Sequence, residues 1–249
     1  MKLYGVATSR ASRNIWLINE LDLDVERIAV VQAYRLEEQG LDPRAQDAPL
    51  NTLSAEFLAL SPAGMVPLLE HDGLILFESL AINNYLAQQA AWEGAEIGPR
   101  DDTERALIEQ WALYGTSVIE GAALDIMWVH SHGRAGSNAG QAELADLRAK
   151  LLRPLAVLEA HLVREGVMVG GRFTVADINM AEIIRYAALD APLMERFGAI
   201  RAWLDRCHAR PAFKMMMAER AAEIAAETCD EDASPTANST QHDAAAPPS

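Results

Sequence analysis

The first ninety residues alternate short apolar runs of strand length with segments whose apolar residues recur at helical spacing. Runs at 3–6 and 25–31 are predicted strands. The segment 15–21 between them is a predicted helix, with Arg13 and Asn14 among the polar residues on its opposite side. Because a right-handed crossover helix joins the two strands, they should lie parallel. This part of the chain therefore predicts an α/β domain that opens with a strand, helix, strand unit.

A second pair of apolar runs, 66–70 and 74–77, flanks an Asp72-Gly73 turn. An Asp-Gly pair between two apolar runs is a strong hairpin signal, so these strands should be antiparallel. A helix is predicted over 79–89. The polar stretch 32–61 before the hairpin is predicted to be a long surface connection, with a short amphipathic helix only near 57–60.

From residue 103 the apolar spacing becomes helical throughout, which predicts an all-helical bundle. The residues that carry this spacing are Leu107, Trp111, Tyr114 and Val118, then Leu147, Leu151, Leu155, Leu158 and Leu162. The glycine-containing segment 133–140 should form the tip between two antiparallel helices. The predicted units are an α/β domain (1–90), a linker (91–102), an all-α domain (103–227) and a disordered acidic tail (228–249). The tail has no large apolar side chain to offset its ordering entropy.

Composition narrows the class of protein. Half of the residues are hydrophobic, 23% are charged, and the net charge is −15. A chain of this charge repels a polyanion, so we expect no nucleic-acid partner. The two cysteines, Cys207 and Cys229, are too few for a disulfide framework. No signal peptide or membrane span is apparent, which predicts a cytoplasmic protein with no membrane contact.

Two motifs of the first domain indicate a binding site. Pro67 stands at the mouth of a predicted strand, where a cis bond would turn the Val66 backbone outward and expose a main-chain donor and acceptor. Glu78-Ser79 opens the next helix, where free amides and the helix dipole favour an anion. Ordinary helix capping is the alternative role for Glu78 and Ser79.

These motifs and this topology resemble the cytosolic glutathione transferases, over almost the whole chain up to residue 227. The resemblance is to a bacterial, serine-dependent type. It implies a thioredoxin-like domain followed by a helical domain, with Val66 pairing with the cysteinyl backbone of glutathione beside a cis Pro67. It also implies that Ser79 binds the γ-glutamyl carboxylate and that Glu78 lies near its ammonium group.

Such enzymes must hold glutathione as a thiolate, although a free thiol has a pKa of about 8.5. In serine-dependent members the activating residue follows the first strand, and Ser9 matches that spacing, with Ser12 as the runner-up. Ser9 could instead be only a helix cap. Tyr4 lies within the predicted strand and is assigned to packing. The turn contains no cysteine, which disfavours mixed-disulfide chemistry.

The second domain has a marker of its own. Thr174 and Asp177 can form a capping box, with Phe173 packing on Ile178, at the start of a helix that is apolar nearly all round. A matching cap is structural in the resembled family. His130 and His132 are two residues apart and point to different sides of a helix, so no metal site is indicated. Some of the residues Trp111, Tyr114, Met127 and Trp128 could line a pocket for an apolar electrophile.

The resemblance implies a detoxifying glutathione S-transferase that adds glutathione to a small hydrophobic electrophile and needs no cofactor besides this co-substrate. It also implies a homodimer. The alternatives are a non-catalytic binding or scaffold protein, and a glutathione-dependent isomerase, dehalogenase or peroxidase. The connection 32–61 should contact the glycyl end of glutathione, and Arg35, Arg44 and Gln46 are the possible partners of its carboxylate.

Overall fold

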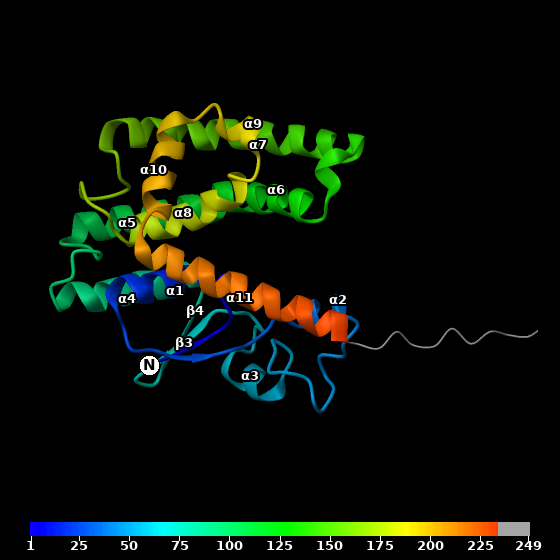
Figure 1. Ribbon diagram of the computed structural model, residues 1–249. Helices are drawn as coiled ribbons and strands as arrows, with labels where there is room; N and C mark the ends of the chain where they lie inside the picture. Colours follow the sequence, from blue (N-terminus) through cyan, green and yellow to red (C-terminus); the bar gives the residue numbers. More distant parts are fainter. Residues whose placement is uncertain (234–249) are drawn as a thin grey trace, which may run out of the picture.

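The computed structural model describes residues 1–233, with side chains as far as residue 226. Its N-terminal domain contains one four-stranded sheet in the order β2-β1-β3-β4 (Figure 1). The strands are β1 (Lys2–Tyr4), β2 (Glu26–Ile28), β3 (Leu68–His71) and β4 (Leu74–Phe77). β1 pairs parallel with β2 and antiparallel with β3, and β3 pairs antiparallel with β4. The predicted topology is confirmed, although the first two strands are shorter than the apolar runs.

The β3–β4 hairpin turns at Asp72 and Gly73, whose φ angles are 49° and 82°. Two consecutive positive φ angles are what a two-residue type I′ turn requires, and this accounts for the Asp-Gly pair. The hairpin places β4 at the edge of the sheet. Phe77, Ile75 and Leu74 on this edge strand are exposed.

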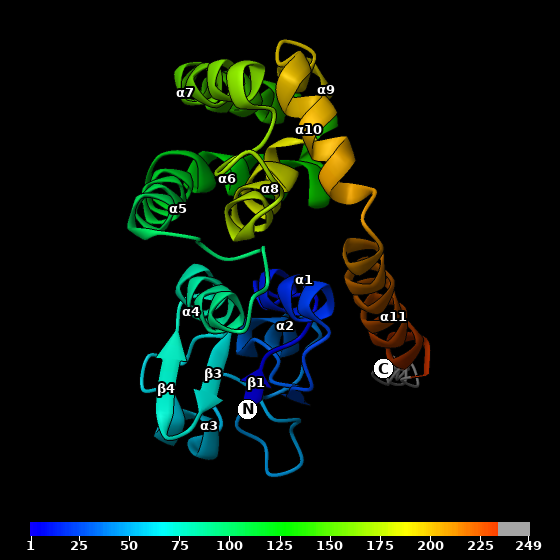
Figure 2. The same ribbon diagram turned by 90° about the vertical axis from the view of Figure 1, so that its left-hand side faces the viewer.

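Helices cover both faces of the sheet. α1 (Ser12–Leu21) and α4 (Ser79–Trp92) pack on the face that carries Leu3 and Leu69. α3 (Ala55–Leu60) covers the other face through Phe57. The predicted polar side of α1 is wrong, because the side chains of Arg13 and Asn14 are buried. The helical domain lies over α1, as Figure 2 shows, and its Glu120 accepts from Arg13, whereas Asn14 donates to Ser79 and Asn83 of α4.

The stretch 32–61 is more structured than the sequence predicts. It contains α2 (Ala33–Glu38) as well as the expected short helix α3. α2 is anchored by only two buried apolar residues, Ala33 and Leu36, which is too little for a visible period. The rest is organised by the buried amide of Asn51, which donates to the carbonyls of Pro43 and Pro49 at 2.9 and 2.8 Å.

The C-terminal domain is all-helical over its described residues. Its elements are α5 (Asp102–Tyr114), the π-helix η1 (Gly115–Glu120), α6 (Gly121–Ser131), the short 3₁₀ turn η2 (Arg134–Gly136), α7 (Asn138–Glu165), α8 (Val175–Ala187), α9 (Ala191–Met194), α10 (Gly198–His208) and α11 (Pro211–Ala233). α6 and α7 lie antiparallel across the predicted tip, as Figure 1 shows. The connection from α4 to α5 runs through residues 93–101, within the predicted linker.

α8 is the central helix of this domain and is buried on nearly all sides. The predicted capping box is present at its start. The Asp177 carboxylate accepts from the Thr174 amide at 2.9 Å, and also from the Met168 amide at 3.0 Å and the Trp203 indole at 2.8 Å. Asp177 therefore joins α8 to α10 as well as capping its own helix.

The last helix returns to the first domain. α11 runs alongside α1 and reaches the loop between β1 and α1 (Figures 1 and 2). α11 continues to Ala233, so residues 228–233, which composition places in the tail, are helical. The prediction for 234–249 lies outside the described residues. Cys207 is buried, as expected. No helix within residues 1–233 combines the length and apolar character that crossing a bilayer needs.

Candidate active site

The loop between β1 and α1 carries Ser9. The Ser9 hydroxyl donates to the Val6 carbonyl at 2.7 Å and accepts from the Ala11 amide at 3.1 Å. The residue is 5% exposed and stands just before α1. Its hydroxyl proton is therefore committed within the loop, and Ser9 must release Val6 before it can donate to a ligand.

α11 clamps the same loop from outside. The Glu223 carboxylate accepts from the backbone amides of Ala7 and Thr8 at 2.8 and 2.7 Å. One turn earlier, Arg220 donates to the Ala7 carbonyl at 2.7 Å. The amide and the carbonyl of Ala7 are thus both bound by α11, which holds the loop that carries Ser9.

The hydroxyls of the runner-up Ser12 and of Tyr4 are both engaged elsewhere. Ser12 has no exposed surface, and its hydroxyl donates to the Glu182 carboxylate at 2.7 Å. Tyr4 is also buried, and its hydroxyl donates to Glu70 at 2.9 Å. Burial first, and then Glu70, raise the pKa of Tyr4 to about 12. Ser12 therefore serves interdomain packing, and the assignment of Tyr4 to packing agrees with its position.

The Val66–Pro67 peptide bond is cis, as the motif predicts. β3 begins only at Leu68, so Val66 lies outside the ladder. Within the described chain, neither the N–H nor the C=O of Val66 has a backbone partner. The exposed main-chain donor and acceptor that the motif predicts are therefore present.

Glu78 and Ser79 form the entry to α4. Glu78 has φ 68° and ψ 112°, a conformation that costs a non-glycine residue about 1–3 kcal/mol and occurs at ligand-holding sites. Arg13 donates to the Ser79 hydroxyl oxygen at 3.1 Å, and Asn14 donates to the Ser79 carbonyl at 2.8 Å. Because the Ser79 oxygen accepts from Arg13, its own proton is available to a ligand at the helix N-terminus.

Arg13 and Glu120 are the buried members of an ionic cluster that crosses the domain boundary and also includes the more exposed Arg10. Glu120 accepts from Arg13 at 2.9 Å and from Arg10 at 2.8 Å. Burial would raise the pKa of Glu120, but the charges of Arg13 and Arg10 lower it below its ordinary value. Burial would lower the pKa of Arg13, but Tyr186 and Glu120 raise it overall. Glu120 ends the π-helix η1, an irregularity that often marks a functional site.

The motifs converge on one pocket of about 410 Å³. Val66, Pro67, Glu78 and Ser79 all line it, together with Arg13 and Glu120 from the ionic cluster. Ser9 lies instead in a neighbouring pocket of about 240 Å³, and Ser12 lines neither. The structure therefore brings four of the predicted site residues together and places Ser9 beside them.

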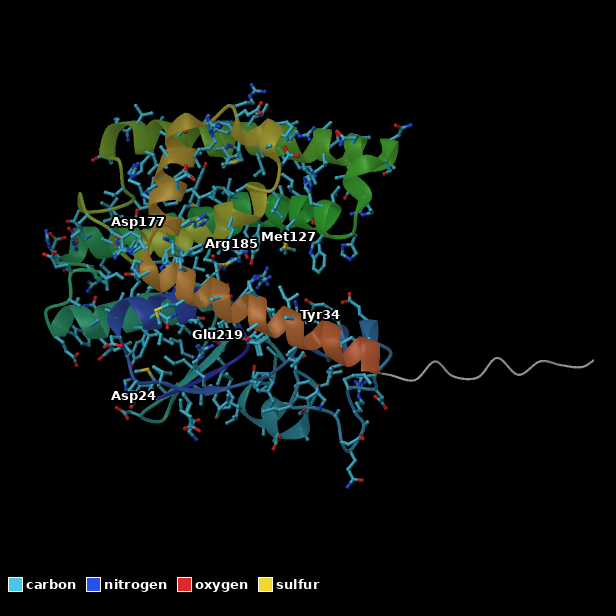
Figure 3. The ribbon with its side chains drawn as sticks, viewed as in Figure 1. Asp24, Tyr34, Met127, Asp177, Arg185 and Glu219 are labelled. Carbon is cyan, nitrogen blue, oxygen red and sulfur yellow. The ribbon has the colours of Figure 1, made fainter. Side chains whose placement is uncertain are left out.

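The smaller pocket lies between the two domains. Tyr34 on α2 and Met127 on α6 stand on opposite sides of it, as Figure 3 shows. Trp128 and Leu124 add apolar surface. Of the four residues that could line a pocket according to the sequence, Met127 and Trp128 do so. Trp111 and Tyr114 do not appear in its lining, and their rings pack on each other with centroids 5.6 Å apart.

The three possible glycyl contacts are separated in space. Arg35 lines the smaller pocket and donates to the Thr8 hydroxyl at 2.7 Å. Arg44 and Gln46 line a different hollow, near α3. No group of metal-ligating side chains occurs among the described residues, and His130 lies 3.5 Å from the buried Asp190.

Sequence reasoning missed Arg10, Arg13 and Glu120 as site residues. Arg13 looks like a surface residue because Ser12 before it and Asn14 after it are also polar. One available signal was Glu120, which is the single carboxylate within the otherwise apolar stretch 118–124, where it needs a cationic partner. The identity of that partner depends on how the two domains dock.

Comparison with known proteins agrees with this geometry. The N-terminal domain model of glutathione S-transferases matches residues 1–88, and the C-terminal domain model matches residues 121–211. Glutathione S-transferase 3 of Zea mays is 31% identical over 237 residues, covering 88% of this chain and 93% of that protein.

Solved structures are similar over the same extent. Glutathione transferase F7 from Populus trichocarpa has a TM-score of 0.70 at 26% identity and covers 88% of this chain and 98% of that one. The theta class glutathione S-transferase from Xanthomonas axonopodis pv. citri, solved with glutathione bound, has a TM-score of 0.66 at 28% identity. It covers 86% of this chain and 95% of that one.

Proposed function

The chain belongs to the glutathione S-transferase family, and on that premise we propose that glutathione binds in the 410 Å³ pocket with its sulfur directed toward Ser9. The activity is that of a glutathione transferase, which joins the sulfur of glutathione to an electrophile. The observation that carries the site assignment is the convergence of Val66, Glu78 and Ser79 on one pocket.

Each part of glutathione has a group that suits it. The Val66 main chain pairs with the cysteinyl backbone in an antiparallel manner beside Pro67. The Ser79 hydroxyl, oriented by Arg13, donates to the γ-glutamyl carboxylate at the α4 N-terminus. The Glu78 carboxylate lies near the γ-glutamyl ammonium. Of the three glycyl candidates, Arg35 is the one beside the Ser9 loop.

The chemistry requires the thiol to ionise. Its S–H bond breaks and the proton passes to water, while the Ser9 hydroxyl leaves the Val6 carbonyl and donates to the sulfur. The thiolate electron pair then forms the S–C bond, and a leaving group departs with the electrons of its own bond. Each unit by which the thiol pKa falls corresponds to about 1.36 kcal/mol of preferential stabilisation of the anion. No cofactor besides glutathione enters these steps.

Calorimetric titration with glutathione, together with turnover of a chlorinated nitrobenzene, tests this function. Binding and turnover are expected, and Ser79→Ala should weaken glutathione binding at least tenfold. The exposed Ser117→Ala is the matched control and should change neither measurement. A wild-type protein that neither binds glutathione nor turns over the substrate would instead be the scaffold alternative. Turnover of isomerase, dehalogenase or peroxide substrates alone would identify the third alternative.

The edge of the sheet supports the proposed homodimer. β4 is an edge strand with exposed Phe77, and Leu113 on α5 is also exposed, at 56% and 68% respectively. We place the first-domain edge of one protomer against the helical domain of its partner. Equilibrium sedimentation should give twice the 27.2 kDa chain mass, and Phe77→Glu should shift it toward the monomer. A wild-type monomer would contradict the assignment. A cytoplasmic location and a role in detoxification complete the proposal.

A further inference from the structure

Arg10 occupies the junction of the two pockets. Among the described lining residues it is the only one that belongs both to the pocket assigned to glutathione and to the smaller pocket that contains Ser9. In the proposed binding mode the sulfur of glutathione points from the first pocket toward Ser9 in the second, which directs it to this junction. The side chain of Arg10 is 42% exposed, in contrast to the 9% of its partner Glu120.

One hydrogen bond holds the Arg10 side chain in place and leaves its other donors available. Its Nε donates to Glu120 at 2.8 Å. Among residues 1–226, whose side chains the structure describes, neither terminal nitrogen of the guanidinium has a hydrogen-bond acceptor. The fork of a guanidinium is planar and rigid, so one bond through Nε fixes the direction of the remaining donors. These donors remain available to an anion.

The ionic cluster has more positive than negative charge, and the unbalanced positive charge lies on Arg10. Arg10 and Arg13 share the single carboxylate of Glu120. Arg13 is 1% exposed and already bonds Ser79 as well as Glu120. The more exposed Arg10 is therefore the cation that can meet an additional negative charge.

Ser9 alone would stabilise the thiolate of glutathione only weakly. Its hydroxyl proton is engaged by the Val6 carbonyl, and releasing it leaves that carbonyl without this bond. A guanidinium needs no such rearrangement. A charged donor also stabilises an anion about twice as strongly as a neutral one.

We propose that Arg10 is a second catalytic residue, whose guanidinium donates a charge-assisted hydrogen bond to the thiolate sulfur of bound glutathione. This inference rests on the proposed function. Arg10 holds the anion and takes no proton, since the thiol proton passes to water. Glu120 is the positioning residue that aims the guanidinium.

The test titrates the thiol of bound glutathione by its thiolate absorbance in the ultraviolet, in the wild type and in Arg10→Met, which keeps the stem and removes the charge. The thiol pKa should rise by about one unit in Arg10→Met, so kcat/KM at neutral pH falls about tenfold. The affinity for S-methylglutathione, which has no ionisable thiol, should stay within threefold. Arg10→Lys retains a positive charge and should give an intermediate pKa.

Arg105→Met is the matched control, because Arg105 is similarly exposed and pairs with one carboxylate, Asp102, away from both pockets. It should leave the thiol pKa unchanged. An unchanged pKa in Arg10→Met would overturn the proposal. So would a tenfold loss of S-methylglutathione affinity at constant pKa, which would make Arg10 a carboxylate ligand. In both cases wild-type binding and turnover would still stand, whereas their absence would refute the proposed function itself.

Discussion

The contact between Glu223 and the Ser9 loop gives a prediction that can be measured at single amides. Glu223 accepts from the Ala7 and Thr8 amides at 2.8 and 2.7 Å, and α11 brings it there from more than 200 residues away in the chain. A hydrogen bond to a charged group contributes about 1.5–3 kcal/mol. Because Glu223 is half-buried and water can replace it, we take the lower figure for each bond, or about 3 kcal/mol for the pair.

In Glu223→Ala, this loss should open the loop locally without unfolding the domain. About 3 kcal/mol corresponds to roughly a hundredfold faster hydrogen exchange at the two amides. Exchange followed residue by residue by NMR measures it directly, and kcat should fall because the loop that carries Ser9 is less ordered. The buried amides of α1 should keep their wild-type exchange rates.

Glu219→Ala is the control on the same helix. Glu219 pairs with Arg27, and both side chains are about one-third exposed, so the pair is worth about 0–1 kcal/mol. Exchange at Ala7 and Thr8 should not change in this variant. If Glu223→Ala also leaves both amides unchanged, α11 does not clamp the loop. If it accelerates the whole of α1 equally, the effect is global and the local argument is refuted.

Three further predictions, made with four substitutions, test other parts of the molecule. Ser9→Ala should lower kcat at least tenfold and raise the kinetic pKa of the thiol. The melting temperature should fall only as far as the loss of the two hydrogen bonds of the Ser9 hydroxyl requires. Wild-type activity in this variant would exclude Ser9 from the chemistry. Thr174→Ala should lower the free energy of unfolding, measured in urea, by about 1–2 kcal/mol. Asp177→Ala should lower it clearly more, because Asp177 also accepts from the Met168 amide and the Trp203 indole outside the cap. Equal losses in the two variants would contradict this. Burial raises the pKa of Glu182, but Arg185 lowers it overall to about 2, below the ordinary 4.5. The ionised Glu182 therefore stabilises the fold above pH 4.5, and this contribution is lost as the pH falls through 2. Glu182→Gln should show a shallower fall in unfolding free energy over that range, and an unchanged slope would count against the assignment.

The local features of the site could be predicted from the sequence because each depends on neighbouring residues. An Asp-Gly pair defines its own turn, Thr174 and Asp177 are three residues apart, and Pro67 restricts only the bond before it. The strand and helix order followed from apolar periodicity for the same reason. α2 was missed because two buried residues are too few to show a period.

The tertiary structure decided what the charged and hydroxyl side chains do. Ser12 and Arg13 look like surface residues at the start of a helix, yet Glu182 and Glu120 bury and bind them from the second domain. The clamp by Glu223 and the position of Arg10 between two pockets likewise depend on how the domains dock. Periodicity reports which face of a helix is apolar. A buried ion pair such as Arg13 with Glu120 depends on a partner more than a hundred residues away, and only the packed fold brings the two charges together.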